Sequence, residues 1–329
     1  MRAASVCQFE IEVAHPFRLD FTVWTLRRRP HNAVDGWNGT RYRRTLVIGE
    51  VPVEVTVRQE SNDKVALLAV EVRHRGAGLD DHSRSEIRHV LTRLLGLEAN
   101  LSGFYQMAES EPLLATLAHQ FVGMRPPCFP SVFEAAINAI ACQQLSLTVG
   151  IHLLNRLSEQ FGPTASMGSE VPHGFPTPAR LAVEDPQHLR NLGFSQSKAR
   201  AIIELSQRIV AGDTDLQSLW DADDGQAKTT LLDLTGIGRW SAEYILLRGL
   251  GRLHILPGDD IGARNNLHRR FDLPASAGYE EVKQYSRRWS PYGGLVYFHL
   301  LLDALANTGN VRPEAWDDTT ATGYLEWFE

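Results

Sequence analysis

The spacing of apolar residues changes once along this chain of 329 residues, and that change limits the possible folds more than any other feature. In residues 51–57, valines alternate with polar residues or proline, which is the period of a half-buried strand. Pro52 places this strand at a sheet edge or near a strand start. A second apolar run, residues 65–72, follows a Ser-Asn-Asp turn and predicts a hairpin. From Glu111 onward the spacing is helical nearly to the end.

Between these two parts the sequence predicts one further helix. Ser83 and Glu86 have the spacing of a capping box, apolar residues follow at helical intervals, and Gly96 marks the end. We therefore predict an α+β fold. An antiparallel β-sheet domain with a helix, residues 1–108, precedes an all-helical domain, residues 109–329. The length agrees with about two domains.

The composition is that of a globular protein, with 43% hydrophobic and 22% charged residues, and no apolar run approaches the length of a membrane span. The formal net charge of −6 by itself argues against nucleic acid as a partner. Charge is unevenly spread, however, because residues 236–294 hold nine basic and six acidic side chains. Cys7, Cys128 and Cys142 lack metal-ligand spacing and fit a reducing compartment, so we expect a cytoplasmic protein.

A pair of glycines separates two helical segments in residues 228–250. Gly236 and Gly238 flank Ile237, and two glycines in three residues allow a sharp turn and a close approach of the backbone to a partner. Such a turn exposes amide groups at the start of the second helix, where the helix dipole favours an anion such as a DNA phosphate. A purely structural turn, with Ile237 in the core, is the alternative.

Asp259 and Asp260 follow a Pro-Gly pair and precede another expected helix. An aspartate at such a place is ordinarily the N-cap of the helix. The functional alternative is a partly buried catalytic carboxylate, which can stabilise positive charge on a sugar C1′ or orient a water toward that carbon.

Several segments together resemble the helix-hairpin-helix DNA glycosylase superfamily, and within it the AlkA-like 3-methyladenine DNA glycosylase II family. The matching segments are residues 133–146, 175–178, 192–200, 234–244, 256–260 and 288–292, followed by His299. They keep the family's order along the chain. The resemblance implies a β-sheet domain, a helical core of two subdomains, and a monomer that acts on double-stranded DNA containing alkylated bases.

The resemblance also implies roles for individual residues. Asp260 matches the family's catalytic aspartate, and Asp259 is then a capping or supporting group. Trp240 stands where bifunctional relatives carry a nucleophilic lysine. Because an indole cannot form a Schiff base, a monofunctional glycosylase without lyase activity is implied.

DNA contacts follow from the same resemblance. Leu145, next to Gln144, matches the side chain that is wedged into the base stack when the target nucleotide is extruded, with an ordinary core leucine as the alternative. The hairpin residues expected at the DNA backbone are Gly236, Ile237, Gly238 and Arg239. The family also binds an alkali cation, Na⁺ or K⁺, through hairpin carbonyls, which here belong to Leu232, Leu234 and Ile237. No other cofactor is expected.

The base pocket is expected around an aromatic wall. Trp240 and Tyr244 lie one helical turn apart, and an alkylated purine, cationic before cleavage, is attracted to such rings. Packing in the core is the alternative for both. Ile261 and Leu301 fall where relatives place pocket aromatics, which implies a wider pocket. Trp24 is expected to line the pocket from the N-terminal domain.

Together these features predict hydrolysis of the N-glycosidic bond of alkylated bases, such as 3-methyladenine and 7-methylguanine, after the nucleotide is flipped into a cleft. Three alternatives remain open. One is a helix-hairpin-helix module that only binds DNA, and another is a glycosylase for a different damaged base. The third is a helical interaction domain in which the glycine turn is purely structural.

Overall fold

The computed structural model describes residues 4–61, 66–75, 79–165 and 173–312. Its N-terminal part contains a five-stranded antiparallel sheet in the order β1-β5-β4-β3-β2. The strands are β1 (Ala4–Val13), β2 (Gly36–Trp37), β3 (Arg41–Ile48), β4 (Val51–Ser61) and β5 (Ala66–Arg75). β4 and β5 form the predicted hairpin, with Val57 opposite Val70. Pro52 is the second residue of an inner strand, so it marks a strand start and not an edge.

One face of the sheet packs against helix α2 (Asp81–Leu94). Buried valines of β4 and β5 share a hydrophobic cluster with three apolar residues of α2, namely Ile87, Leu91 and Leu94. The helix begins before Ser83, because Asp80 is the N-cap and its carboxylate accepts the Ser83 amide at 2.8 Å. The predicted capping box is therefore wrong, since an aspartate three residues earlier already satisfies that amide. Gly96 follows the helix with a φ of +62°.

The remaining chain is mostly helical, which confirms the predicted fold class. The helices are α1 (Leu19–Arg27), α3 (Ser102–Glu109), α4 (Pro112–Gln120), α5 (Val132–Cys142), α6 (Leu147–Phe161), α7 (Pro178–Ala182), α8 (Pro186–Asn191), α9 (Gln196–Ala211), α10 (Asp224–Leu232), α11 (Arg239–Arg248), α12 (Ile261–Phe271), α13 (Tyr279–Ser286) and α14 (Gly293–Asn307). Within the described ranges, no helix combines the length and apolar character needed to cross a membrane.

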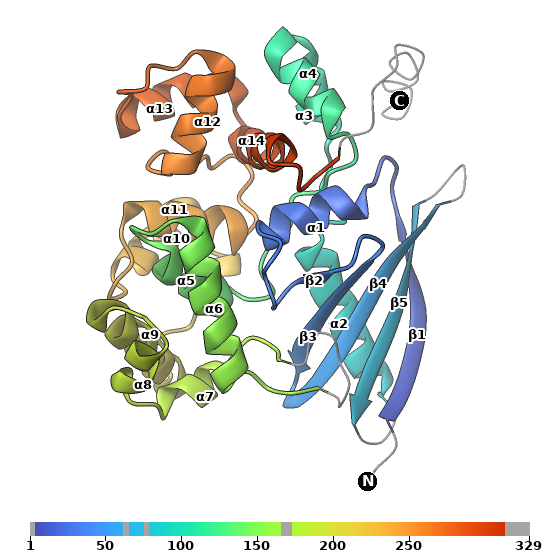
Figure 1. Ribbon diagram of the computed structural model, residues 1–329, viewed down its shortest axis with the longest axis vertical. Helices are drawn as coiled ribbons and strands as arrows, with labels where there is room; N and C mark the ends of the chain where they lie inside the picture. The colour runs from blue at the N-terminus through green and yellow to red at the C-terminus, as the bar shows by residue number, and fades with distance from the viewer. Residues whose placement is uncertain (1–3, 62–65, 76–78, 166–172, 313–329) are drawn as a thin grey trace.

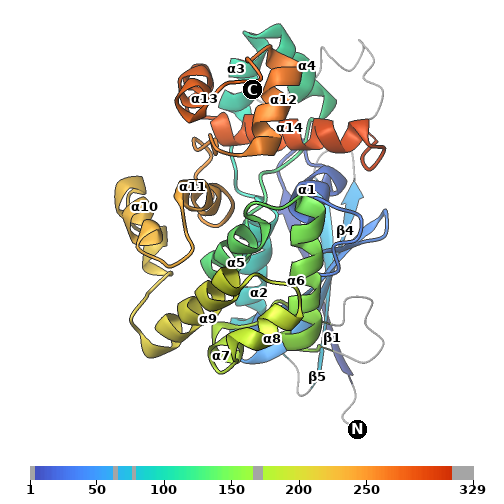
Figure 2. The ribbon, with the colours of Figure 1, turned by 60° about the vertical axis from the view of Figure 1, so that its left-hand side comes forward.

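Two hydrophobic clusters divide these helices. The first cluster joins the sheet and α2 to helices α5 to α11, and the second contains α3, α4, α12, α13 and α14. Figures 1 and 2 show the second group together at one end of the molecule, with α1 between that group and the sheet. α1 contributes Val23 to the first cluster and Phe21 to the second. The expected domain border before residue 109 falls within α3, which packs in the same cluster as α4.

A buried ion-pair network attaches the sheet to the helical part. Arg44 of β3 donates to Glu134 Oε2 of α5 at 2.6 Å and pairs with Asp35 at 2.5 Å. All three side chains are buried. Removing one partner from such a network typically costs about 3–5 kcal/mol, because a buried charge is left without compensation. The sheet and α5 are therefore held in one fixed arrangement.

Candidate active site

Asp260 stands at the start of α12, in the connection that follows α11. Its Oδ1 accepts the amide of Ala263 at 2.8 Å, which makes Asp260 the N-cap of α12. The capping interpretation is thus correct for this aspartate. Capping uses only one of the two carboxylate oxygens, so Oδ2 can serve a second purpose.

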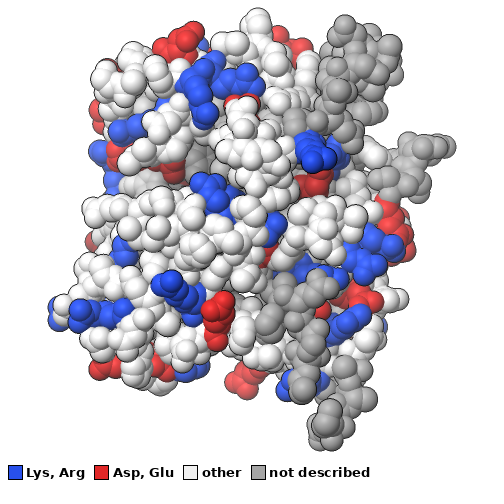
Figure 3. All heavy atoms as spheres, in the orientation of Figure 1, with Lys and Arg blue, Asp and Glu red and all other residues white. Residues whose placement is uncertain are grey.

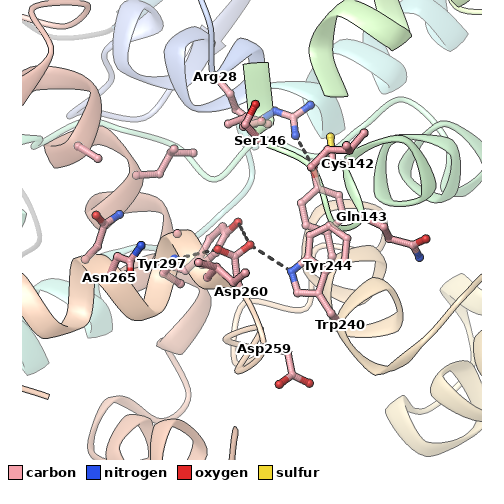
Figure 4. Close-up of a pocket in the computed structure, with 18 of the residues that line it drawn as sticks. Arg28, Cys142, Gln143, Ser146, Trp240, Tyr244, Asp259, Asp260, Asn265 and Tyr297 are labelled. Carbon is pink, nitrogen blue, oxygen red and sulfur yellow. Dashed lines mark hydrogen bonds between the residues drawn. The ribbon is translucent and has the colours of Figure 1, made fainter. Parts of the chain in front are cut away.

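Two aromatic side chains from different helices hold Oδ2. The indole Nε1 of Trp240 on α11 and the hydroxyl of Tyr297 on α14 each donate to it at 3.2 Å (Figure 4). Burial, and next the charge of Asp260, raise the pKa of Tyr297 well above its ordinary value, so the hydroxyl keeps the proton that it donates. Tyr297 was not expected from the sequence, although it lies one helical turn before Leu301.

Trp240 and Tyr244 form the aromatic wall on α11. Their ring centroids are 5.2 Å apart and the ring planes differ by 32°. Tyr244 is buried and Trp240 is half-buried. The Tyr244 hydroxyl accepts a hydrogen bond from Arg28 Nη1 at 2.7 Å. Because Arg28 is the C-cap of α1, the N-terminal part of the chain reaches this site directly.

A cleft of about 1540 Å³ opens in front of this wall and Asp260. The residues that line it include Arg28, Leu145, Trp240, Tyr244, Asp260 and Tyr297. Ile261 and Leu301 also line the cleft, as expected.

Trp24 does not line the cleft, contrary to expectation. Its ring packs against the second cluster, and the Arg27 guanidinium lies 4.8 Å from the ring centroid. Among the residues of the N-terminal part, Arg28 and Arg29 line the cleft, and Arg28 is the C-cap of the same helix. Arg28 leaves the helix in the left-handed conformation, with a φ of 61°.

Asp259 is the supporting group of the two expected alternatives and not the cap, which is Asp260. Its carboxylate forms ion pairs with Arg239 at 2.6 Å and with Arg264 at 2.7 Å. The Arg239 guanidinium also lies 3.7 Å from the ring centroid of Tyr279. Asp259 therefore partly neutralises Arg239, the side chain expected at the DNA backbone.

Glu243 attaches the loop that carries both aspartates to α11. Its buried carboxylate accepts the Gly258 amide at 3.0 Å and the Tyr279 hydroxyl at 2.6 Å. Glu243 lies one helical turn from Trp240, so the same helix fixes both the indole and the loop that ends at Asp260. Glu243 was not expected from the sequence as a residue of this site.

The loop that carries the expected wedge residue Leu145, residues 143–146 and here called the wedge loop, follows α5. Gln144 has a φ of 54°, and the Leu145 side chain is 43% exposed, which excludes the core alternative for that leucine. Gln143 Nε2 donates to the Gly236 carbonyl at 2.7 Å and to Ser241 Oγ at 2.6 Å. The wedge loop is thus bound directly to the glycine turn.

Lys198 of α9 supports the wedge loop from the other side. Its Nζ donates to the carbonyl of Ala141 at 3.0 Å and to that of Gln143 at 2.7 Å. A lysine at this place satisfies carbonyls that the end of α5 leaves open and adds a positive charge favoured at a helix C-terminus. These hydrogen bonds hold the backbone of the loop that carries the exposed Leu145 side chain.

The glycine turn between α10 and α11 has the expected geometry. Gly236 has a φ of +82°, and a Cβ there would lie 2.7 Å from the Cβ of Ala201. Gly238 is the N-cap of α11 and provides no side-chain acceptor for the first amides of that helix. Ile237 is buried and anchors the turn in the first cluster. The amides at the start of α11 can therefore bind an anion.

Basic side chains do not form one continuous patch on the face shown in Figure 3, where they are dispersed among uncharged and acidic residues. Arg29, Arg239 and Arg269 line the cleft. In the part of the chain that the structure describes, no group of three or more His, Cys, Asp or Glu is arranged to hold a metal ion. The positive charge at this site thus comes from a few local arginines.

Comparison with known proteins identifies the family. The family model of the HhH-GPD superfamily, described as base excision DNA repair proteins, matches residues 137–291. The matched segment contains the wedge loop, the glycine turn and Asp260, which the structure brings together around one cleft. The chain belongs to the HhH-GPD superfamily. As an HhH-GPD protein, it carries the matched segment in its helical part, outside the N-terminal sheet.

Relatives of this HhH-GPD protein cover most of its length. A DNA-3-methyladenine glycosylase of Bacillus subtilis is 25% identical over 78% of this chain and 84% of its own. DNA-3-methyladenine glycosylase 2 of Escherichia coli is 28% identical over 87% of this chain and 93% of its own. The solved structure of a 3-methyladenine DNA glycosylase from Archaeoglobus fulgidus superposes with a TM-score of 0.79, at 26% identity, over 92% of this chain and all of that one.

Proposed function

We propose that this protein is a monofunctional DNA glycosylase of base excision repair, which hydrolyses the N-glycosidic bond of alkylated bases such as 3-methyladenine and 7-methylguanine. The observation that carries the proposal is the Asp260 carboxylate, held by Trp240 and Tyr297 inside a cleft that the wedge loop borders. The names of the relatives support this substrate class.

The cleft can act on DNA only if the target nucleotide leaves the duplex. Leu145 is an exposed apolar side chain on the cleft border, and it would fill the space that the extruded base vacates. The amides at the start of α11 would hold a phosphate of the same strand. Wedge and phosphate site are joined through Gln143, so the strand would be bent and held by one connected unit.

Cleavage would proceed through a cationic deoxyribose. The C1′–N bond breaks, its electron pair leaves with the base, and positive charge develops on C1′ and the ring oxygen. Asp260 Oδ2, facing the cleft, stabilises that charge. A water then adds to C1′ and releases one proton, which leaves a free base and an abasic sugar. An N-alkylated purine departs as a neutral molecule, so the leaving group needs little assistance.

The absence of a usable amine supports hydrolysis without strand cleavage. A lyase reaction needs a lysine or another amine to form a Schiff base with C1′. No lysine is among the described residues that line the cleft, and Trp240 occupies the place beside Asp260. We therefore expect an intact abasic site as the product.

An alkali cation at the hairpin is part of the proposal. The Leu234 carbonyl accepts the Ile237 amide at 3.1 Å, whereas the Leu232 and Ile237 carbonyls accept no hydrogen bond from the described part of the chain. Such carbonyl oxygens suit a hard cation. When bound, Na⁺ or K⁺ would add positive charge next to the amides that face the phosphate.

The test is base release from methylated duplex DNA by the wild type and the Asp260→Asn variant. Asparagine also caps helices, so the variant should fold. We expect base release to fall by about 10²- to 10⁴-fold while DNA binding survives. Asp223→Asn, which changes the N-cap of α10, is the matched control and should keep full activity. Undiminished release by Asp260→Asn would refute the assignment and favour a protein that only binds DNA.

A further inference from the structure

An exposed apolar ridge continues from the wedge loop into α6. Val149 lies four residues after Leu145, and each of the two side chains is 43% exposed. Ser146 is the N-cap of α6, so Val149 belongs to the first turn of that helix. Leu145 lines the cleft but Val149 does not. The ridge therefore extends beyond the cleft, and filling the cleft does not account for the exposed valine.

Two residues that follow α1 flank this ridge. Arg29 Nε donates to Thr148 Oγ1 at 3.2 Å, and His31 Nε2 donates to the Thr148 carbonyl at 3.4 Å. The His31 ring also stacks on His152 of α6, with centroids 4.1 Å apart and planes that differ by 15°. Figures 1 and 2 show the end of α1 next to the start of α6. These side chains form one surface, here called the α6 surface, which consists of Arg29, His31, Thr148, Val149 and His152.

The α6 surface is positively charged. Its residues come from segments 27–34 and 143–158, which contain arginines and histidines but neither aspartate nor glutamate. Arg156 extends the charge by one further turn of α6 and is exposed. Within the ranges that the structure describes, neither Arg29 nor Arg156 forms an ion pair. An anion that approaches this surface therefore meets cations without a competing carboxylate.

Leu145 separates the α6 surface from the glycine turn. Before the leucine, the Gln143 side chain is bound to the Gly236 carbonyl of that turn at 2.7 Å. After the leucine, Thr148 is bound to Arg29 instead. The two sides of the wedge residue are thus attached to different parts of the fold. The side of α6 offers apolar and cationic side chains, which are the groups that contact sugars, base edges and phosphates.

The two sides of a wedge meet different strands of a duplex. A side chain wedged into the base stack takes the place of one extruded nucleotide, so the strand with the lesion lies on one side of it and the opposite strand on the other. The amides at the glycine turn are the proposed site for a phosphate of the lesion strand. The α6 surface then faces the opposite strand.

We propose that the α6 surface binds the DNA strand opposite the damaged nucleotide. Val149 packs against a sugar or base edge of that strand, and Arg29 and His152 contact its phosphates. The inference rests on the proposed glycosylase activity, which assigns the lesion strand to the glycine turn. The protein would then hold a duplex by both strands, one on each side of Leu145, and would bind double-stranded DNA in preference to a single strand.

The test removes phosphate charge from one strand at a time. A duplex contains a tetrahydrofuran analogue of an abasic site, which has no base to release, and a short run of neutral methylphosphonate linkages facing it in the opposite strand. Fluorescence anisotropy gives the affinities of the wild type and of the double variant Arg29→Met with His152→Gln. We expect the neutral linkages to weaken binding by the wild type about tenfold. The double variant should lose less than about threefold, because it no longer contacts those phosphates.

Matched controls separate this contact from charge in general. Arg84→Met with His89→Gln makes the same two changes at exposed residues of α2 and should remain as sensitive to the neutral linkages as the wild type. The unmodified duplex and a duplex with neutral linkages only in the lesion strand complete the set. Neutral linkages in the lesion strand should weaken binding by the wild type and by both double variants alike.

Val149→Ala tests the apolar contact and keeps the proposal falsifiable if the double variant at the α6 surface fails to fold. Alanine favours a helix, so this variant should fold. It should weaken binding to the unmodified duplex by about threefold, whereas Val210→Ala, at an exposed valine of α9, should not. Equal affinities of both valine variants and the wild type would contradict the apolar contact.

Two results would overturn the inference as a whole. One is a wild type whose affinity is unchanged by neutral linkages in the opposite strand. The other is a double variant at Arg29 and His152 that is as sensitive to them as the wild type, because other residues would then contact those phosphates. Base release from methylated duplex DNA is assayed in the same wild-type preparation. Its absence would contradict the proposed function and not the strand contact.

Discussion

The indole Nε1 of Trp240 donates to Oδ2 of Asp260 at 3.2 Å, so the aromatic wall of the cleft and its carboxylate are joined by a hydrogen bond. The two residues come from neighbouring helices, α11 and α12, on either side of the loop that Glu243 holds. The proposed function therefore gives Trp240 two roles. In the proposed reaction it would supply a face for the base and keep Asp260 turned toward the sugar.

Trp240→Phe should separate these two functions. Phenylalanine retains a ring but cannot donate to Asp260, so we expect base release to fall by about tenfold while affinity for damaged DNA changes little. Single-turnover rates and DNA binding, measured in parallel, would show this. Trp220→Phe is the control, because the Trp220 Nε1 is buried without a partner in the described chain. Equal losses in both variants would show that Trp240 acts only through packing.

Base release by a Tyr297→Phe variant is measured in the same experiment and compared with that by Trp240→Phe. Tyr297 and Trp240 donate to the same oxygen, so their losses should not be additive in the double variant. Strictly additive losses would mean that the two hydrogen bonds do not cooperate in orienting Asp260.

Leu145→Ala should impair extrusion and not chemistry. Leu145 is exposed at the border of the cleft, and a shorter side chain cannot fill the gap in the base stack. We expect base release from duplex DNA to fall by about tenfold, with little change on a single-stranded substrate, where no unstacking from a partner strand is needed. Val183→Ala, at an exposed valine outside the cleft, is the matched control. A similar loss on both substrates would contradict the wedge role.

Gly236→Ala should test the close packing of the glycine turn. Gly236 and Gly212 have nearly equal φ values of +82° and +81°, but a Cβ at Gly236 would lie 2.7 Å from Ala201, whereas nothing lies within 4 Å at Gly212. Gly212→Ala should therefore cost about 1–2 kcal/mol of unfolding free energy from the backbone alone. Gly236→Ala should cost about 1–3 kcal/mol more and weaken DNA binding. Urea unfolding of both variants would detect the difference.

His299 should make the fold sensitive to acid. The side chain is buried in α14, and burial lowers its pKa from 6.5 to about 4. The unfolded chain then binds a proton more readily than the folded one. The free energy of unfolding should be unaffected above pH 6.5 and should decrease as the pH falls from 6.5 toward 4.

A His299→Leu variant would remove this dependence. Between about pH 8 and about pH 5 we expect it to lose about 2 kcal/mol less than the wild type in urea unfolding. His89→Leu, at an exposed histidine of α2, should behave like the wild type. An identical pH dependence in the wild type and His299→Leu would show that this histidine does not limit stability in acid.

Much of the fold could be predicted because its signals are local. The alternating valines of β4, the turn before β5 and the helical spacing after Glu111 each act within a few residues. The start of α2 was misplaced because Asp80 and Ser83 are both good caps, and only the backbone decides between them. The packing of α3 with the C-terminal helices depends on contacts that no short segment reveals.

The placement of residues at the cleft was predictable where the family's motif names them, as for Asp260, Trp240 and Leu145. Tyr297 and Arg28 were missed because they reach the cleft from helices distant in the sequence. Trp24 was expected from the resemblance to the family, whereas Arg28, the C-cap of α1 four residues later, lines the cleft. Such positions are decided by tertiary packing.

The position of α1 has a consequence for any shortened form of this protein. The strands on either side of α1 anchor the helix, whose C-cap supplies Arg28 behind Tyr244, and Arg44 attaches the sheet to α5. Deleting about the first hundred residues would thus also remove contacts that the helical part of the chain makes with α1 and the sheet. It would expose the back of the aromatic wall, where Arg28 contacts Tyr244, to water.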